Sequence, residues 1–174
     1  MKTYIDANIG ALKSLKEVIA SCDDPAYLMV SKPAFQSSLG QHARHIVEHY
    51  QCFLKQMSEG KALNYDLRCR DPRLDNERET CISEIDSLII ALNKLQTLDV
   101  DVQLSDDYSQ YEARSSLCRE LMFLVSHTEH HNAMIAAMKR ISGDCVDESF
   151  GVANATLNHI ERLKTAANKA VNES

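Results

Sequence analysis

Apolar residues recur every three or four positions along most of the chain, a spacing that places side chains on one face of an α-helix. The pattern predicts five helices, over about residues 4–21, 35–58, 75–98, 115–141 and 154–170. The last of them is shorter, and its apolar pattern is weaker. The sequence has only five glycines and three prolines, which favours long uninterrupted helices.

Turn-forming residues mark the breaks between these segments. The Asp-Asp-Pro run at 23–25 interrupts the first helical pattern, and Gly143 follows the fourth as a C-terminal capping signal. Asp75 or Asn76 could cap the N-terminus of the third helix, because a short polar side chain there accepts hydrogen bonds from free backbone amides.

Residues 99–111 have a different pattern. Val100, Val102 and Leu104 alternate with polar residues, which predicts a short strand and a hairpin turning at residues 105–107. Four long helices with one apolar face each are expected to pack as a bundle. The predicted fold is therefore all-α: a four-helix bundle with a short β-hairpin-like insertion before the fourth helix and a shorter C-terminal helix. The connections are too long to define its topology.

Size and composition fit one domain covering residues 1–174, with 44% apolar and 25% charged residues. The net charge is −6 and no basic block occurs, so a nucleic-acid partner is not expected. No apolar run reaches the roughly 18–20 residues of a membrane span. Six cysteines without a C-x-x-C pair, and an N-terminus without an apolar signal core, favour the cytoplasm.

The histidines carry the candidate chemistry. Six of the seven form two groups, one in each of two predicted helices: His42, His45, His49, and His127, His130, His131. With about 100° of rotation per residue, the first group lies on one flank of its helix's apolar stripe. In the second group His127 and His131 lie near the edge of the stripe, whereas His130 points outward.

This spacing suits a metal ion. Imidazoles four residues apart on a helix can reach the same ion, and a third imidazole from a neighbouring helix would complete a three-histidine site. Three protein ligands leave coordination positions open for water or substrate. His42, His45 or His49 could be the third ligand. The alternative is that these are hydrogen-bonded core histidines without a metal. Neither the Glu-x-x-His pairs of di-iron bundles nor the H-E-x-x-H of zinc proteases is present.

Further side chains could line such a site. Glu120 lies two turns before His127 on about the same side and could orient an imidazole, or it could be a surface charge. His42 could also orient a ligand. A polar cluster follows the second predicted helix: Tyr65, Asp66, Arg68, Arg70 and Asp71. Its alternating charges indicate either a network that holds the loop or a mouth that recognises an anion.

Together the segments SSLGQHARHIVEHYQCFL and HTEHHNAMI resemble the DinB-like superfamily of metal-binding four-helix proteins. The resemblance covers most of the chain. It implies an up-up-down-down bundle in which His45, His127 and His131 bind zinc, nickel or a similar divalent ion. It also implies a homodimer, because many members form one. Similar proteins include low-molecular-weight-thiol transferases, maleylpyruvate isomerase-like enzymes and metal-dependent hydrolases.

The expected function is therefore metal-dependent hydrolysis, or transfer of a low-molecular-weight thiol, with a small molecule as substrate. One alternative is a non-catalytic bundle that binds a metal or small ligand. Another is a structural helical dimer in which the core satisfies the histidines.

Overall fold

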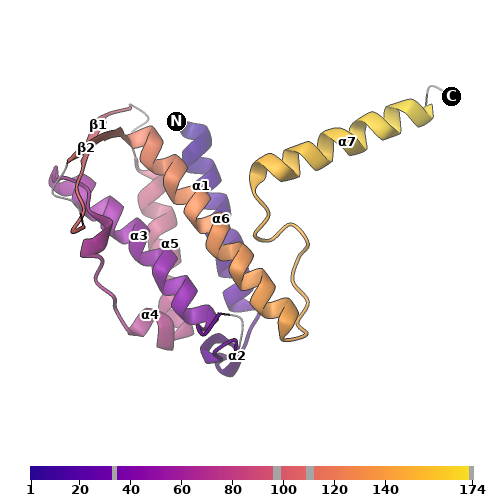
Figure 1. Cartoon of the computed structure of the whole chain (residues 1–174), viewed down its shortest axis with the longest axis horizontal. Coiled ribbons are helices and arrows are strands. Elements are labelled where there is room, and N and C mark those ends of the chain that lie inside the picture. Colours follow the sequence, from indigo (N-terminus) through magenta and orange to yellow (C-terminus); the bar gives the residue numbers. More distant parts are fainter. Residues whose placement is uncertain (33–34, 96–98, 109–111, 173–174) are drawn as a thin grey trace.

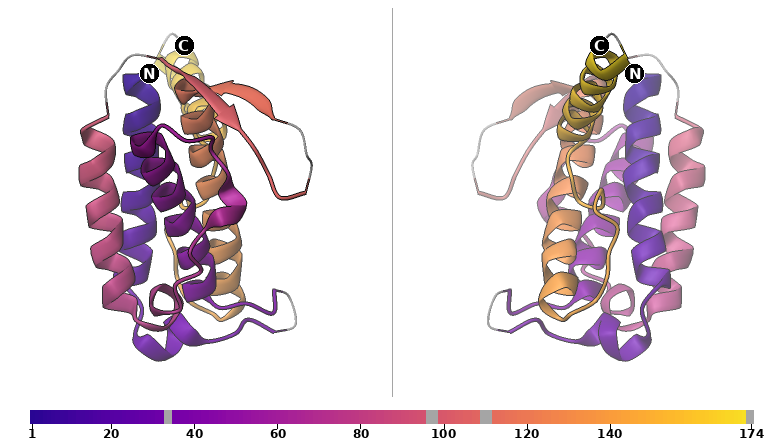
Figure 2. Two further views of the ribbon diagram at one scale, coloured as in Figure 1. Left: turned by 90° about the vertical axis from the view of Figure 1, so that its left-hand side faces the viewer. Right: turned by 90° about the vertical axis from the view of Figure 1, so that its right-hand side faces the viewer.

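The computed structural model describes residues 1–32, 35–95, 99–108 and 112–172, and most of these are helical. Four long helices lie side by side, and a fifth, α7, projects away from them (Figure 1, Figure 2). They are α1 (Lys2–Ala20), α3 (Leu39–Glu59), α5 (Arg78–Asn93), α6 (Leu117–Ile141) and α7 (Asn154–Asn172). Such a fold is consistent with the predicted all-α class. No helix among the described residues is long and apolar enough to cross a membrane.

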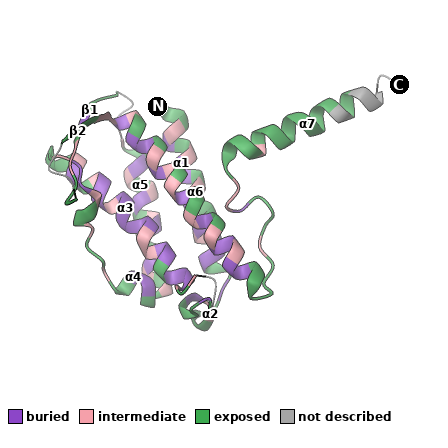
Figure 3. Cartoon of the chain, in the orientation of Figure 1, coloured by how far each residue is buried: buried purple, intermediate pink, exposed green. Residues whose placement is uncertain are grey.

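Helices α1 and α3 each pack against both α5 and α6. The apolar stripes expected from the sequence face one another there, and Figure 3 shows buried residues along the facing sides of these helices. Leu12, Ile46, Ile85 and Leu121 are among the side chains that are buried. Hydrogen bonds also join three helices inside the bundle: the hydroxyl of Tyr50 on α3 lies 2.7 Å from Oδ1 of Asn8 on α1 and 2.9 Å from Oγ1 of Thr128 on α6.

The directions of the helices differ from the up-up-down-down order. Helices α1 and α6 run one way and α3 and α5 the other, an up-down-down-up order (Figure 1). Near the N-termini of α1 and α6, Nδ2 of Asn8 donates to the carbonyl oxygen of Leu121 at 2.9 Å. Along the parallel pair, Nε2 of Gln51 donates to Glu84 at 2.9 Å. Helices α3 and α5 run in the same direction because the segment between them returns to the end of the bundle where α3 began (Figure 1).

Two short helices were missed by the periodicity, α2 (Asp24–Leu28) and α4 (Arg73–Asn76). The Asp-Asp-Pro run ends α1 but also starts α2. Asp23 accepts a hydrogen bond from the Ala26 amide at 2.8 Å, and a proline in the first turn has no amide to leave unpaired. Helices α2 and α4 have only five and four residues, too few for a helical period to be seen in the sequence.

The third and fifth predicted helices have different ends from those expected. Asp75 does not cap α5: it lies buried in α4 and pairs with Arg44 at 3.0 Å, and α5 follows Glu77 without a side-chain cap. The predicted end of this helix, residues 96–98, lies outside the described residues. Helix α7 has 19 residues and α5 has 16, so the prediction of a shorter C-terminal helix is wrong. Helix-favouring Ala and Lys extend α7 beyond its apolar pattern.

The hairpin lies before α6, as predicted. Strands β1 (Asp101–Leu104) and β2 (Ala113–Ser116) pair antiparallel. The expected turn at 105–107 is part of a longer connection, of which 109–111 lie outside the described residues. Ser115 belongs to β2 rather than to the helix, and Ser116 caps α6 by accepting from the Arg119 amide. The amide of Leu63 donates to the carbonyl of Gln103 at 2.7 Å, which attaches the segment after α3 to β1.

The N-terminus of α3 is held tightly, and this sets the position of its histidines. The helix begins at Leu39, four residues later than predicted, because Ser38 and Gln41 form a reciprocal capping box. Gly40 passes so close to α4 and α2 that a Cβ there would lie 2.4 Å from the carbonyl oxygen of Asp75 and 2.8 Å from the Tyr27 ring. Only glycine fits this approach.

Candidate metal centre

His45 on α3 and His127 and His131 on α6 converge between the two helices. One ring nitrogen from each of these histidines lies within 4.8 Å of the others. The ring of His131 lies 4.6 Å from that of His45 and 4.6 Å from that of His127, between centroids. The antiparallel packing of α3 and α6 brings them together, since a step of one turn along α6 keeps both of its histidines beside His45. All three are half-buried.

The donor set fits a divalent metal ion. Nε2 of His45 lies 3.1 Å from Nε2 of His127. Metal–nitrogen bonds of about 2.0–2.1 Å in a tetrahedral site separate neighbouring ligand nitrogens by about 3.3 Å, close to this distance. Nδ1 of His127 is buried and has no hydrogen-bond partner in the described part of the chain. An ion at Nε2 would leave this Nδ1 unpartnered, so the spacing of the two Nε2 atoms is what matches a metal site.

The three imidazoles are neutral at neutral pH, as metal ligands must be. Burial lowers the pKa of His45 to about 4, and the nearby Arg68 guanidinium adds to the shift. Burial likewise lowers the pKa of His127 to about 2 and that of His131 to about 3, with the neighbouring imidazoles contributing to both. Desolvation disfavours the charged ring, which leaves a lone pair available on each one.

His42 connects His131 to Ser37 through a chain of hydrogen bonds. The Ser37 hydroxyl lies 2.8 Å from Nε2 of His42 and 3.3 Å from the carbonyl oxygen of Phe35. Nδ1 of His42 lies 3.0 Å from Nδ1 of His131. When Ser37 donates to Phe35, a neutral His42 accepts the Nδ1–H of His131, and this arrangement leaves the Nε2 lone pair of His131 free for an ion.

His49 lies beside the centre with both nitrogens engaged. Its Nδ1–H donates to the carbonyl oxygen of His45 at 2.7 Å, and its Nε2 faces Nη1 of Arg68 at 3.4 Å. Its ring lies 4.0 Å from that of His127, between centroids. Among the three candidates on α3, the group that could hold an ion thus includes His45, whereas His42 and His49 have protein partners on both nitrogens. His130 is exposed, as the helical phase predicted.

Glu120 is buried, 3% exposed, but its carboxylate contacts no imidazole. It accepts hydrogen bonds from the Tyr65 hydroxyl at 3.0 Å and from the Ser115 hydroxyl at 2.6 Å. Burial and the Glu120 charge raise the pKa of Tyr65 well above its usual value, so the phenol stays protonated. The Tyr65 ring stacks on His49 at 5.4 Å between centroids. Glu120 therefore acts on the centre through Tyr65, which belongs to the short 3-10 helix η1 (Tyr65–Leu67).

The polar cluster after α3 divides into two roles. Nη1 of Arg68 contacts the carbonyl oxygen of Tyr65 as well as His49, so these two residues reach the histidines. Oδ2 of Asp66 accepts from the Asp107 amide at 3.2 Å and ties the loop to the hairpin connection. The Asp71 amide donates to Glu48, and its carboxylate pairs with Arg73 at 2.6 Å. Arg70 is exposed with a φ of +55°.

Two residues that contact the histidines, Phe123 and Ser37, were not identified from the sequence. Phe123 packs against His127 at 5.5 Å and Tyr65 at 5.1 Å, between ring centroids. It lies four residues before His127, so helical phasing could have found it. Ser37 precedes α3 in a loop, where no periodicity indicates its contact with His42.

A cavity of about 350 Å³ lies on the other side of Tyr65 and Phe123, which line it together with Glu120, and no histidine of the centre lines it. Another, larger cavity lies between α3 and α5. The centre thus combines three neutral nitrogen donors with a space for a small molecule behind two aromatic rings.

No known protein-family model matches the sequence. A stretch of the chain is 36% identical over 107 residues to a protein of Rhizopus delemar called FK506-binding protein 5. The match covers 58% of this chain but spans only 28% of the Rhizopus protein. Neither finding tests the DinB-like resemblance, which stays a prediction.

Proposed function

We propose that the protein binds one divalent metal ion through His45, His127 and His131 and uses it in a metal-dependent hydrolysis or in transfer of a low-molecular-weight thiol. The observation that carries the proposal is the convergence of these three imidazoles, with nitrogens within 4.8 Å of one another and pKa values lowered by burial. Zinc and nickel are the preferred ions, since both accept imidazole nitrogen and tolerate open positions.

When bound, the ion supplies a Lewis acid that lowers the pKa of water or of a thiol, so that either becomes a nucleophile near pH 7. The chain's own residues would arrange the rest. Tyr65 and Phe123 wall the neighbouring cavity. Arg68, whose guanidinium contacts His49, provides positive charge that favours an anionic reactant.

We also propose that α1, α3, α5 and α6 form a DinB-like four-helix bundle. Support comes from the packing of α1 and α3 against both α5 and α6, and from the position of the histidines between α3 and α6. Six free cysteines are in keeping with a cytoplasmic protein. A homodimer is expected from the resemblance, and light scattering of the purified protein tests it.

Metal content tests the proposal directly. Protein without a histidine tag is purified under metal-replete conditions and analysed by mass spectrometry of the elements. We expect one zinc or nickel ion per chain, and loss of that ion in His45→Ala, His127→Ala and His131→Ala. His130→Ala is the matched control, because this exposed imidazole neighbours His131 but points away. A wild-type protein that contains no divalent ion rejects the proposal.

Turnover separates the enzyme from a binding protein. The loaded protein is assayed for hydrolysis of p-nitrophenyl acetate and for conjugation of glutathione or cysteine to 1-chloro-2,4-dinitrobenzene. We expect one of these activities to depend on His127. Stoichiometric metal without metal-dependent turnover would instead support the alternative, a non-catalytic bundle that binds a metal or small ligand.

A further inference from the structure

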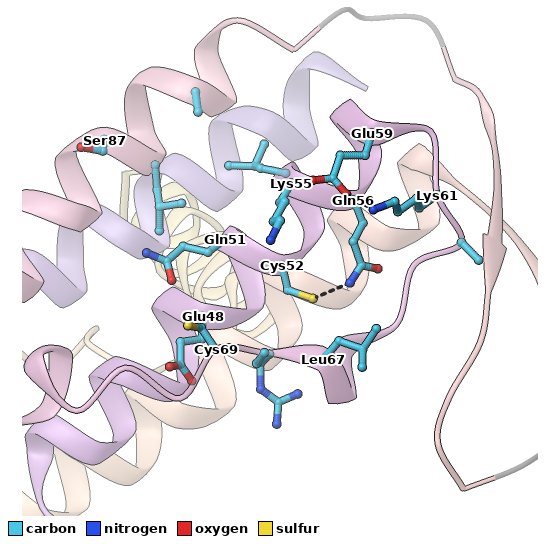
Figure 4. A pocket seen from close by; sticks show the side chains of 15 residues that line it. Glu48, Gln51, Cys52, Lys55, Gln56, Glu59, Lys61, Leu67, Cys69 and Ser87 are labelled. Atoms are coloured by element: carbon cyan, nitrogen blue, oxygen red, sulfur yellow. Dashed lines mark hydrogen bonds and ion pairs between the residues drawn. The ribbon is translucent and has the colours of Figure 1, made fainter.

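A cavity larger than the one walled by Tyr65 and Phe123 is separate from the metal centre. It has a volume of about 600 Å³ and lies between α3, α5 and the segment 61–69 (Figure 4). The histidine cluster lies instead between α3 and α6. Cavities of about 300–1,000 Å³ are typical of sites for small molecules.

One part of the cavity wall is apolar. Leu54 on α3 and Leu88 and Ala91 on α5 line it, together with Leu67 on the connecting segment. Leu67 is 64% exposed and extends this apolar wall to the surface. An apolar body of a few carbon atoms would therefore leave water on entering this space.

The polar groups around the same cavity have unequal partners. Among the acidic residues, Glu59 pairs with Lys61 at 2.7 Å, and Glu48 accepts the Asp71 amide at 2.6 Å. Burial raises the pKa of Glu48, and the Asp71 amide and the nearby Arg44 and Arg68 act against this shift. Both carboxylates thus have partners within the protein.

One positive group keeps unused donors. Lys55 forms no ion pair or side-chain hydrogen bond with the described residues, and Figure 4 shows its side chain pointing into the cavity. Arg68 also lines the cavity, but its Nε is buried and its guanidinium contacts Tyr65 and His49. The ammonium group of Lys55 therefore accompanies an apolar wall.

We infer that this cavity binds a small amphipathic anion, a carboxylate on a short aliphatic chain. The carboxylate accepts hydrogen bonds from the ammonium group of Lys55, and the aliphatic chain packs on Leu54, Leu88 and Ala91. Charge-assisted hydrogen bonds to a carboxylate are stronger than neutral ones.

Octanoate is the probe, titrated into the full-length protein by calorimetry. We expect saturable one-to-one binding with a Kd below about 1 mM, as ligands of this size allow. Octan-1-ol and octylamine share the aliphatic chain but lack the negative charge, and we expect at least about tenfold weaker binding of both. Octylamine binding as tightly as octanoate, or no saturable octanoate binding, overturns the inference.

Variants locate the site. Ala91→Phe fills the cavity and should abolish octanoate binding, whereas Asn93→Phe, on an exposed position of α5 outside the cavity, should not. Lys55→Glu should weaken binding about tenfold, and Lys94→Glu, also exposed and outside the cavity, should leave it unchanged. Thermal unfolding verifies that each variant is folded. Unaltered octanoate affinity in both Ala91→Phe and Lys55→Glu contradicts the inference.

One further variant separates this cavity from the metal centre, since a carboxylate can also bind a metal ion. His127→Ala removes a proposed ligand of the metal. We expect octanoate to bind this variant as tightly as the wild type. Loss of octanoate binding there would place the anion at the histidines and overturn the inference, whatever the metal analysis shows.

Discussion

Nδ1 of His42 lies 3.0 Å from Nδ1 of His131, and this contact joins α3 to α6 beside the metal centre. On its other side His42 is held by the Ser37 hydroxyl at 2.8 Å. Because a neutral imidazole has one donor and one acceptor nitrogen, the tautomer of His42 is coupled to that of His131 through this contact.

His42→Ala removes this support without removing a proposed ligand. We expect metal affinity to fall about 10- to 100-fold, the usual effect of losing a group that orients a metal-binding histidine. Ser37→Ala should cause a smaller loss in the same direction. Competition with a chromophoric chelator measures both, with His130→Ala as the control. An affinity for zinc that is unchanged in His42→Ala would show that His131 needs no such orientation.

Added metal should stabilise the folded protein. At a free zinc concentration of about 100 times Kd, binding to the folded state alone contributes about 2.7 kcal/mol, or about 5–11 °C in Tm for a chain of this size. Differential scanning fluorimetry of chelator-treated protein measures the shift. His127→Ala should show almost none of it. A wild-type Tm that is insensitive to zinc and nickel would favour satisfied core histidines instead.

The metal-free protein should lose stability as the pH falls from about 6.5 towards 4. Burial lowers the pKa of His45 to about 4 in the folded protein, and the pKa values of His127 and His131 are lower still. In the unfolded chain they titrate near 6.5, so over this range the unfolded state binds more protons and is favoured by acid. Urea unfolding at pH 7, 6 and 5, with chelator present, gives the free energy of unfolding.

The matched variant for that experiment is His127→Gln, which removes one of the imidazoles that stay neutral on folding. Its free energy of unfolding should depend less on pH than that of the wild type. His159→Gln, on an exposed position of α7, should keep the wild-type dependence. Equal slopes in all three proteins would mean that the buried imidazoles do not set the acid sensitivity.

The hydrogen bond between Tyr65 and Glu120 should matter for stability. Tyr65→Phe leaves one oxygen of a buried carboxylate without its donor, and we expect a loss of about 1–3 kcal/mol in the free energy of unfolding. Tyr108→Phe is the control, because Tyr108 is fully exposed. A double-mutant cycle with Glu120→Gln isolates the coupling between the two residues. Coupling near zero would assign both effects to other contacts.

The Tyr50 hydroxyl, between Asn8 and Thr128, offers a test that leaves the metal site intact. Tyr50→Phe leaves Oδ1 of Asn8 buried without a donor, so we expect a loss of about 1–3 kcal/mol in the free energy of unfolding. Metal content should stay that of the wild type. Chemical denaturation and elemental analysis of the same preparation give both results. A drop in bound metal together with stability would show that this tie also positions the histidines.

Much of the architecture follows from local patterns. The three- and four-residue spacing of apolar side chains predicted the long helices, because one face of each helix must be buried. The alternation at Val100, Val102 and Leu104 predicted the strand before α6. The helical phase of His127 and His131 placed both at an edge of their stripe and turned His130 outward.

Other features depend on contacts between distant parts of the chain. Helical periodicity carries no information on direction, so the parallel run of α3 and α5 was not evident before the path of the connecting segment was known. From the sequence, Glu120 could orient an imidazole or be a surface charge, but the tertiary structure buries it and places Tyr65 between its carboxylate and His49.

The sequence by itself determined which side chains could be metal ligands and which helix faces carry them. Only the tertiary structure decided among the candidates on α3. It placed His45 opposite His127 and engaged His42 with Ser37 and His49 with Arg68. The physical reason is that periodicity defines a direction around one helix, whereas a metal site requires nitrogens a few ångströms apart across two. That distance is set by the packing of α3 on α6 and by loop residues that no local pattern connects to the histidines.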